Sequence, residues 1–465
     1  MMKTQSLQRM LIGLVLAMTL VAPWASASTN YYVVAPGQST PTPPWTNWGW
    51  AHTNLIEVVA AARDNDTVYV TNNATYWLTN QIAVTYAITV RSWGPGGILD
   101  PTNTILSGRY PGATNRHFQL NNAGAAVAGF TLKKGCEIYG GSIWLQNGMV
   151  TNCTIVSNFA YTSLEVQGND KRGGGGVHME GSSGGVWNCV FSGNTATNSG
   201  AGICIKSGGP WRIASCRISG GNALISGGGI YAGPGGAGAI ISNCWVVSNY
   251  SPWYAGGIHL ANCAECHNSF IMGNSVDLYE GGGIRMSAGA LVRNCLIVNN
   301  ITQKSHGGGV DARVNASIQN CTIASNEATL KEGGGINLDG SYSAQLENTI
   351  IWGNSGSGTA SNWYIYPTGS GTNTFTNCCT APDIAGVGAY TATEVNTITN
   401  DPRFVNNATD FRLQPDSPCI NAGVNRAWMD GAQDLDGYRR IDNFRKTVDI
   451  GAYEHLGRGT VFKIH

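Results

Sequence analysis

A glycine-rich triplet followed by an aliphatic residue recurs along the middle of the chain at a nearly constant interval. Consecutive aliphatic members are 26 to 28 residues apart. A period of about 20 to 50 residues is typical of solenoids, in which each unit stacks on its neighbours. The repeat therefore predicts one elongated body instead of several globular domains. Its aliphatic members are Val177, Ile203, Ile230, Ile258, Ile284, Val310 and Ile336.

Two further columns keep the same period inside each unit. An Asn-Cys pair recurs, with Ser269 and Thr349 replacing the cysteine in two units, and an asparagine follows it, shifted by one residue only at Asn222. We expect the cysteines to face inward as buried free thiols. We expect the asparagines to hydrogen-bond to the bends and to one another. The columns are Cys153, Cys189, Cys216, Cys244, Cys295 and Cys321, and Asn158, Asn194, Asn249, Asn274, Asn300, Asn326 and Asn354.

The residue types within each unit favour strands over helices. The columns alternate over two or three residues, which is a strand spacing. Glycine makes up 63 of the 465 residues, and a glycine inside a helix costs about 1 kcal/mol relative to alanine. Short units without a helix fit one coil of a parallel β-helix. The sequence therefore predicts an all-β solenoid whose equivalent residues stack about 4.8 Å apart.

Both ends of the repeat region are predicted to carry caps. Residues 54–63 have the pattern of a short amphipathic helix, which would cover the first coil, and strand patterns follow at 66–70 and 87–91. An uncovered first coil would expose a sheet edge. The period decays after Asn354, and the charge-rich tail is predicted to be the closing cap. The expected division is therefore a leader at 1–27, a β-helix with its N-terminal cap at 28–400, and a C-terminal cap at 401–465.

The first 27 residues have the features of a secretory signal. Lys3 and Arg9 precede an uncharged apolar run, and the small residues at 25–27 form a cleavage site. We expect a mature chain that is secreted, periplasmic or held at the cell surface. No later stretch has the about 18 consecutive apolar residues of a membrane span. Basic and acidic residues both number 27, so no positive excess predicts a nucleic-acid partner.

Two parts of the sequence resemble known bacterial families. The Gly-Gly-Gly-Ile and Asn-Cys-x-Ile-x-x-Asn units, over about 150–354, resemble the repeats of polymorphic outer-membrane-type β-helix proteins. The tail is similar to the choice-of-anchor Q domain of bacterial secreted β-helix proteins. This resemblance implies an exported bacterial protein with a single-stranded right-handed parallel β-helix, and it assigns no catalytic residue. The matching tail segments are 401–405 (DPRFV), 411–423 (FRLQPDSPCINAG), 434–437 (DLDG) and 448–454 (VDIGAYE).

The strand after each glycine triplet is predicted to point two polar columns outward. Alternation along a strand places every second residue on the outer face. Aromatic residues in the bends before the triplets, such as Tyr161, lie beside these columns, and the loop at 163–172 is expected to wall the resulting groove. A flat sheet flanked by aromatic rings suits an extended chain of sugars. The predicted substrate-binding residues are Arg313, Asp339, Asn337, Lys206, His178, Trp253, Tyr254 and Tyr279.

The strongest predicted catalytic cluster consists of His259, Arg285, Asp311 and Tyr231 on consecutive coils. A lyase acting on a uronate needs a base, here His259 or Tyr231, and a cation to stabilise the enolate, here Arg285. A glycoside hydrolase would instead need two carboxylates about 5 to 10 Å apart. Asp311 and Asp339 are the candidate pair for that reaction. A further interpretation is that these columns are an ordinary solvated strand face.

A second outer face is expected to be apolar. The residues flanking the Asn-Cys motif include Trp245, Phe270 and Leu296, and Arg217 is the only charged residue among them. Such a face requires a partner, which would be the cysteine-containing tail or another subunit. The oligomeric state is left open by the sequence.

Two motifs have the form of cofactor sites. Cys263-Ala264-Glu265-Cys266-His267 matches a c-type haem attachment motif, but Cys266 falls in an inward apolar column that haem could not reach. The turn Asp434-Leu435-Asp436-Gly437 offers two carboxylates for calcium, with Asp442 as a further ligand, or is simply a capped turn. We expect neither a metal nor another cofactor.

Together, these patterns predict a secreted protein that binds an extracellular polysaccharide and degrades it. A polysaccharide lyase is favoured over a glycoside hydrolase. The alternative is a non-enzymatic surface or adhesin-like protein, in which the solenoid is a rigid spacer or binding wall. Fold alone does not decide between them.

Overall fold

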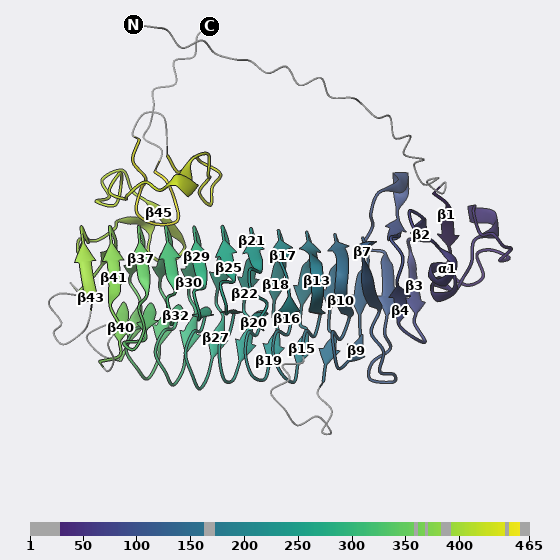
Figure 1. Ribbon diagram of the computed structural model, residues 1–465, viewed down its shortest axis with the longest axis horizontal. Coiled ribbons are helices and arrows are strands. Elements are labelled where there is room, and N and C mark those ends of the chain that lie inside the picture. The colour runs from purple at the N-terminus through teal and green to yellow at the C-terminus, as the bar shows by residue number, and fades with distance from the viewer. Residues whose placement is uncertain are drawn as a thin grey trace, which may run out of the picture.

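The computed structural model describes residues 28–161, 173–357, 361–367, 371–382, 392–441 and 446–455. These residues form a long parallel β-helix with a small module on its flank (Figure 1). Each strand of the solenoid pairs in parallel with the equivalent strand of the next coil, as His259 pairs with Arg285 and Arg285 with Asp311. The predicted all-β solenoid and its stacked columns are confirmed.

The largest sheet, sheet A, receives two strands from most coils, and in three of the early coils these merge into one long strand. The early strands are β1 (Asn30–Val33), β2 (Thr67–Thr71), β4 (Ile82–Val84), β5 (Thr89–Trp93), β7 (Phe118–Ala128), β10 (Ile143–Thr151) and β13 (Val177–Trp187). The strands that follow a glycine-rich triplet, and their continuation in the last coil, are β16 (Ile203–Gly208), β20 (Ile230–Gly235), β24 (Ile258–Leu260), β28 (Ile284–Met286), β32 (Val310–Ala312), β36 (Ile336–Leu338) and β40 (Trp363–Ile365). The second strands are β17 (Trp211–Ala214), β21 (Ile240–Ser242), β25 (Glu265–His267), β29 (Leu291–Arg293), β33 (Ser317–Gln319), β37 (Gln345–Glu347), β41 (Asn373–Thr376) and β43 (Ala392–Val395).

Sheets B and C complete each coil. Sheet B contains β3 (Ala74–Trp77), β6 (Thr104–Ser107), β8 (Thr131–Lys133), β11 (Thr154–Val156), β14 (Val190–Ser192), β18 (Arg217–Ser219), β22 (Trp245–Val247), β26 (Phe270–Met272), β30 (Leu296–Val298), β34 (Thr322–Ala324), β38 (Ile350–Trp352) and β42 (Cys379–Thr380). Sheet C contains β9 (Cys136–Glu137), β12 (Phe159–Ala160), β15 (Thr195–Ala196), β19 (Asn222–Ala223), β23 (Tyr250–Ser251), β27 (Ser275–Val276), β31 (Ile301–Thr302), β35 (Glu327–Ala328) and β39 (Ser355–Gly356).

The cysteine column lies inside the solenoid, as predicted. Its members belong to one continuous hydrophobic core with the aliphatic residues that follow the triplets. The residue before each cysteine has a positive φ, as at Asn243 (53°) and Asn294 (54°). Asparagine tolerates this left-handed conformation better than most residues. The Asn-Cys pair therefore combines a bend between sheets A and B with a small apolar side chain for the core.

The asparagine column forms a hydrogen-bonded ladder inside the bends. The Nδ2 atom of Asn274 donates to Oδ1 of Asn300 at 2.9 Å and to the Val246 carbonyl at 2.9 Å. The backbone N–H of Asn274 donates to the same Asn300 oxygen. Asn222 is exposed, and the backbone N–H of Gly221 takes its place by donating to Oδ1 of Asn249. The shifted asparagine is thus outside the ladder.

The glycine triplets allow the bends of neighbouring coils to approach closely. The first glycine takes a positive φ, such as 81° at Gly281 and 72° at Gly307. A Cβ on the middle residue Gly282 would collide with the Gly308 carbonyl oxygen. Glycine, which has no side chain, allows both the positive φ and the close approach of the backbones. The glycine repeat is therefore required by the packing of coil on coil.

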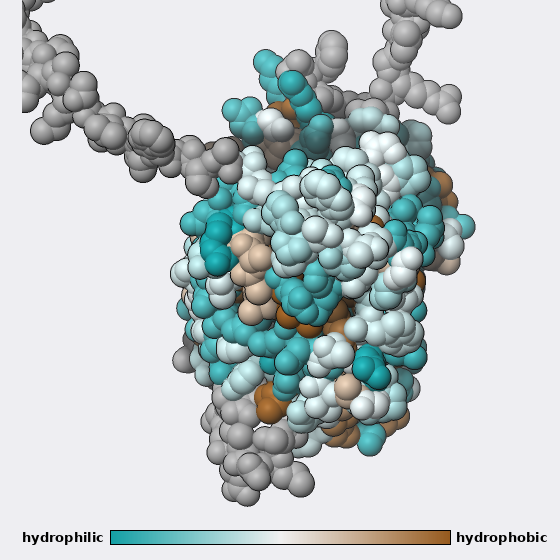
Figure 2. Space-filling model, turned by 90° about the vertical axis from the view of Figure 1, so that its right-hand side faces the viewer, coloured by the Kyte–Doolittle hydropathy of each residue, from teal (hydrophilic) through white to brown (hydrophobic). Residues whose placement is uncertain are grey.

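A short helix covers the first coil. Helix α1 (Leu55–Ala61) is capped by the side chain of Asn54 and buries Leu55, Val58 and Val59. The predicted helix is confirmed, two residues shorter at its C-terminal end than its pattern. The end of the molecule facing the viewer in Figure 2 is mostly hydrophilic, with small apolar patches. Single-turn 3-10 helices occur at Trp48–Trp50 and Pro95–Gly97. No helix in the described ranges is long and apolar enough to cross a membrane.

The C-terminal module packs on the side of the last coils (Figure 1). It contains the antiparallel pair β44 (Phe404–Asn406) and β45 (Asp410–Leu413) and a single-turn 3-10 helix, Ala427–Met429. Phe411 shares a hydrophobic cluster with Leu296 and Ile350 of sheet B. The C-terminal module thus covers the apolar outer face of the late coils. The tail was one of the two partners predicted for this face. Trp245, farther from the module along sheet B, remains 42% exposed and stacks on Phe270 at 4.1 Å.

Candidate functional site

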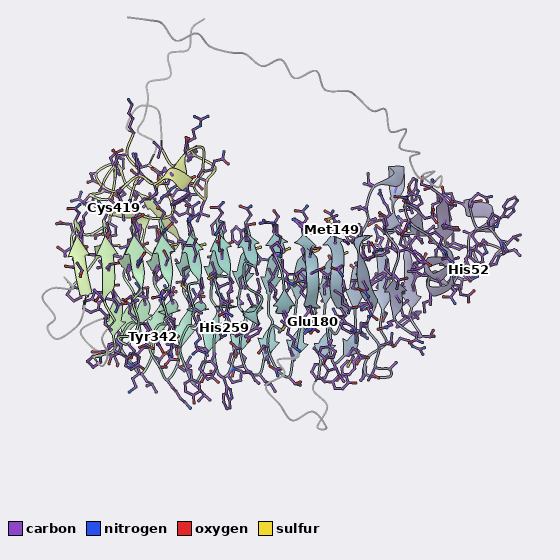
Figure 3. The ribbon with its side chains drawn as sticks, in the orientation of Figure 1. His52, Met149, Glu180, His259, Tyr342 and Cys419 are labelled. Atoms are coloured by element: carbon purple, nitrogen blue, oxygen red, sulfur yellow. The ribbon has the colours of Figure 1, made fainter. Side chains whose placement is uncertain are left out.

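One outward column of sheet A carries the predicted catalytic residues. Strands β20, β24, β28, β32 and β36 place Tyr231, His259, Arg285, Asp311 and Asn337 in direct register. None of these five belongs to the central hydrophobic core. They therefore point outward, as alternation predicts. In Figure 3 the labelled His259 and Glu180 lie along the side of the solenoid away from Cys419 and its module.

The column is largely covered by the bends that precede the glycine triplets. Tyr231, Asp311 and Asn337 are at most 1% exposed, whereas His259 and Arg285 are partly exposed. The Ser226 hydroxyl, in one of these bends, lies 2.6 Å from Nδ1 of His259. The expected open groove is therefore restricted, and only some of its predicted residues reach solvent.

Arg313 is the centre of an ion network at this face. Its Nε atom lies 2.8 Å from Oδ2 of Asp311, and its Nη2 atom lies 3.1 Å from Oε2 of Glu280. Its Nη1 atom is 4.0 Å from Asp339. Burial opposes the charge of Arg313, but the carboxylates of Asp311 and Glu280 raise its pKa. The guanidinium is therefore held as a cation between three acidic side chains.

Asp311 is the buried anchor of the same network. Besides Arg313, it accepts a hydrogen bond from Nε of Arg285 at 3.3 Å and one from Nδ2 of Asn337 at 2.7 Å. Because Asp311 is fully buried, it cannot contact a polymer at the surface, and it positions the two arginines. Asn337, predicted as a substrate-binding residue, is buried too and orients this carboxylate.

Glu280 is a member of the network that sequence reasoning missed. Burial, followed by the nearby charge of Asp311, raises its pKa, and the Ser305 hydroxyl donates to it at 3.2 Å. It occupies the bend position directly before the triplet at 281–283, where neighbouring coils carry Tyr254 and His306. The signal that would have identified Glu280 is a bend position whose residue type changes at every coil.

An aromatic cluster lies beside Arg285. The Arg285 guanidinium carbon is 4.2 Å from the centre of the Tyr254 ring, which stacks on Tyr279 at 4.6 Å. Trp253 is 6.2 Å from Tyr279, and these two rings are 48% and 40% exposed. The predicted association of bend aromatics with the charged column is thus present in the structure. Exposed rings next to a cation can stack on sugar faces.

Tyr231 and His259 are neighbours with different accessibility. Their ring centres are 5.1 Å apart in an edge-on arrangement. Burial raises the pKa of Tyr231, which disfavours the phenolate that a base requires. His259 is therefore the better placed base of the two predicted candidates.

His178 and Lys206 form a separate cluster several coils away. Glu180 joins them, 3.4 Å from Nε2 of His178 and 3.8 Å from the Lys206 ammonium. His178 is fully buried, and burial lowers its pKa. Of these two predicted binding residues, only Lys206 reaches the surface. Tyr161 lies farther toward the N-terminal end, 6.3 Å from Phe159.

Several predicted features lie outside the described residues, namely the leader at 1–27, the loop at 163–172 and Asp442. Within the described part of the chain, no group of three or more His, Cys, Asp or Glu residues is arranged to hold a metal. The Asp434 carboxylate instead accepts backbone N–H groups from Asp436, Tyr438 and Glu454. This is the capped turn that the sequence allowed. In the haem-like motif, Cys266 is fully buried in the core.

Comparisons with known proteins support the fold. A family model described as a right handed beta helix region matches residues 134–313. The fold is a right-handed parallel β-helix. The comparison with curated proteins gives no significant match.

The solved structures that this chain matches have low sequence identity to it. The pectate lyase Pel9A has a TM-score of 0.45 and 14% identity over 93% of this chain and 97% of its own. XylC in complex with xylose has a TM-score of 0.42 and 10% identity over 93% and 99%. The PL6 family alginate lyase AlyGC has a TM-score of 0.40 and 13% identity over 92% and 59%. At these values the likeness carries no argument about activity.

Proposed function

We propose that this protein is exported from a bacterial cell and binds an acidic polysaccharide along the outward face of sheet A. In this proposal it cleaves the polymer by β-elimination beside His259 and Arg285. The observation that carries the proposal is the neighbourhood of three features: a partly exposed histidine, a partly exposed arginine held by Asp311, and the exposed rings of Trp253 and Tyr279. Stacking rings, a cation and a base are what an elimination on a uronate requires.

His259 is the proposed base. When Nδ1 donates its proton to the Ser226 hydroxyl, 2.6 Å away, Nε2 carries the lone pair that accepts a proton. It would take the proton on the carbon next to the sugar carboxylate. The bond from the ring to the departing glycosidic oxygen then breaks, a carbon–carbon double bond forms, and the oxygen takes up a proton from water or the imidazolium.

Arg285 is the proposed stabilising cation. As the proton leaves, negative charge accumulates on the sugar carboxylate, and a fixed guanidinium stabilises that charge more in the transition state than in the substrate. Asp311 and Tyr254 hold Arg285 from two sides, so little reorganisation is needed when the charge develops.

The Glu280 and Asp339 pair favours hydrolysis as the second candidate. Both carboxylates lie within 4.0 Å of the Arg313 guanidinium, and the raised pKa of Glu280 suits a general acid. This pair replaces the predicted pair of Asp311 and Asp339, because the Asp311 side chain is fully buried whereas 9% of the Glu280 side chain is exposed.

Incubation of the mature chain with a panel of acidic and neutral polysaccharides tests the proposal. A lyase releases reducing ends together with ultraviolet absorbance from the unsaturated sugar, whereas a hydrolase releases reducing ends alone. The His259→Ala and Arg285→Ala double variant should lose the lyase signal while remaining folded, which circular dichroism checks. A panel that yields no reducing ends would contradict both reactions and support the non-enzymatic alternative.

A further inference from the structure

The coil that begins with β7 departs from the glycine repeat. Phe118 of β7 pairs with Ile143 of β10, and Ile143 pairs with Val177 of β13. The three residues before Ile143 are Gly-Gly-Ser and those before Val177 are all glycine, but the three before Phe118 are Asn115, Arg116 and His117. Arg116 therefore occupies the position at which the next coils carry Gly141 and Gly175. A large cationic side chain therefore lies at a position where the repeat has glycine, which has no side chain.

Arg116 lines a surface pocket of about 360 Å³. This volume falls in the range of roughly 300 to 1,000 Å³ that is typical of small-molecule sites. Nearly all of the lining residues are polar, and Trp144 supplies an aromatic ring 5.1 Å from the guanidinium carbon of Arg116. The lining consists of Asn80, Gln81, Thr114, Asn115, Arg116, Glu137 and Trp144.

Three residues that line the pocket carry buried hydrogen-bond donors without partners. Arg116 is 6% exposed, and its Nε and Nη1 atoms have no hydrogen-bond partner among the described residues. The same holds for Nδ2 of Asn115 and Nε1 of Trp144. The charge partner of Arg116 within the described ranges is Glu137, whose carboxylate is 3.9 Å from Nη2. Burial lowers the pKa of Arg116 to about 10.

The unsatisfied atoms define the chemistry of a ligand. All of them are donors, so the missing partner must be rich in acceptors. A buried donor without a partner costs about 1 to 3 kcal/mol, and more when it is charged. Arginine forms its strongest pairs with planar carboxylates, and the Trp144 ring offers a face for a sugar ring. We propose that the pocket formed by Asn115, Arg116 and Trp144 binds the carboxylate of an acidic sugar residue.

The pocket lies on the same outward face of sheet A as His259 and Arg285. Trp144 pairs with His178, and the column continues through Cys204, Tyr231 and His259. Asp311 is six register steps from Trp144 along this column, a distance of about 29 Å at 4.8 Å per step. An extended polymer can reach both places. The binding site is nevertheless independent of cleavage, because its residues are separate from those of the proposed reaction.

Isothermal titration calorimetry with defined oligosaccharides tests the proposal. Oligomers of galacturonate, mannuronate or guluronate are compared with neutral and with sulfated oligomers of equal length. The titrations use the full mature chain and its His259→Ala variant, so that turnover by the proposed elimination does not obscure binding. We expect at least one uronate oligomer to bind at least tenfold more tightly than its neutral counterpart. Equal affinity for neutral oligomers, tighter binding of sulfated ones, or no binding would overturn the proposal.

Variants of the pocket locate the binding. Arg116→Gln should weaken uronate binding at least tenfold, and Arg116→Gly, which restores the residue type of the next coils, should do the same. Arg217→Gln removes an exposed arginine of sheet B and is the matched control, with unchanged affinity. Glu137→Gln removes the competing carboxylate and should tighten binding about threefold. Unchanged affinity in Arg116→Gly, with an unaltered thermal midpoint, would refute this assignment whether or not the protein cleaves a polymer.

Discussion

The asparagine ladder and the outward column of sheet A run along the same solenoid and differ in how they use the repeat. Ladder residues such as Asn274, Asn300 and Asn326 are fully buried, and so are Asp311 and Asn337 of the outward column. The ladder has the same residue type and the same bonds at coil after coil. The column changes residue type at each coil and forms contacts specific to each place. Uniform columns therefore hold the coils together, whereas variable columns carry local chemistry.

The exceptions in each column support this distinction. Where the ladder lacks its asparagine, the backbone N–H of Gly221 restores the bond to Asn249, so the structural function persists without the side chain. Where the glycine triplet is lost, at Arg116, the structure leaves donors without partners. The substitution at Asn222 preserves a bond of the repeat and is structural, whereas the unsatisfied donors at Arg116 are explained by the proposed ligand.

Replacing His259 by alanine should have the largest effect on the column. The proton acceptor is lost, so the rate of polymer cleavage should fall about a thousandfold, within the range of roughly 10² to 10⁴ for general bases. Initial rates of unsaturated product formation measure the effect. The thermal midpoint should change little, because His259 is partly exposed. Cleavage within threefold of the wild-type rate would remove His259 from the proposed mechanism.

Replacing Asn300 by alanine should have the largest effect on the ladder. The N–H group of Asn274 and the Ile271 carbonyl would lose their bonds to Asn300, and Nδ2 of Asn274 would keep only its bond to the Val246 carbonyl. We expect the free energy of unfolding to fall by about 3 kcal/mol, as measured by urea denaturation. The matched control is Asn222→Ala at the exposed, shifted position, which should change it by less than about 0.5 kcal/mol. Equal losses in both variants would show that the ladder is not the stabilising element.

Replacing Tyr279 by alanine should weaken substrate binding at the edge of the outward column. Its exposed ring stacks on Tyr254, and loss of one sugar-stacking face should raise the apparent KM about tenfold, equivalent to about 1.4 kcal/mol. The kcat should be nearly unchanged, because the ring does not touch the reacting atoms. Tyr438→Ala, an exposed tyrosine of the side module, serves as the control and should leave KM unaltered.

The pH dependence of Glu280 should be the smallest of these effects. Burial and the Asp311 charge raise its pKa above the ordinary 4.5, so the folded state holds this proton more tightly than the unfolded state. The stability of the wild type relative to Glu280→Gln should therefore be highest below 4.5 and fall as the pH rises through the raised pKa. Urea denaturation of both proteins across this range measures the difference. A stability difference that increases with pH would show that Glu280 gains more from Arg313 than it loses by burial.

The repeat columns were predictable because each depends on a periodic pattern. The inward cysteines and the outward direction of His259 follow from strand alternation once coils are stacked, and the asparagine bonds follow from the same bend residue recurring in stacked coils. The burial of Asp311 and Asn337 did not follow, because it depends on bends that fold back over the strand. Glu280 was missed for the same reason, since it lies in such a bend and outside the predicted strand columns.

The side module shows the same limit. Its tail resemblance and the apolar residues Phe270 and Leu296 both pointed to a cover for the solenoid. In the structure, Phe411 packs with residues on the outer side of sheet B. Only the tertiary packing decides whether the module covers the side or the end of the solenoid.

The sequence by itself determined the parallel β-helix, the stacked columns and the covered first coil. A constant period forces equivalent residues into register, so these features need no knowledge of distant contacts. The tertiary structure alone decided which outward residues reach solvent, which acids share Arg313, and where Arg116 has unsatisfied donors. Each of these features depends on how the bends of different coils pack against one another, and the spacing of residues along the chain does not determine that packing.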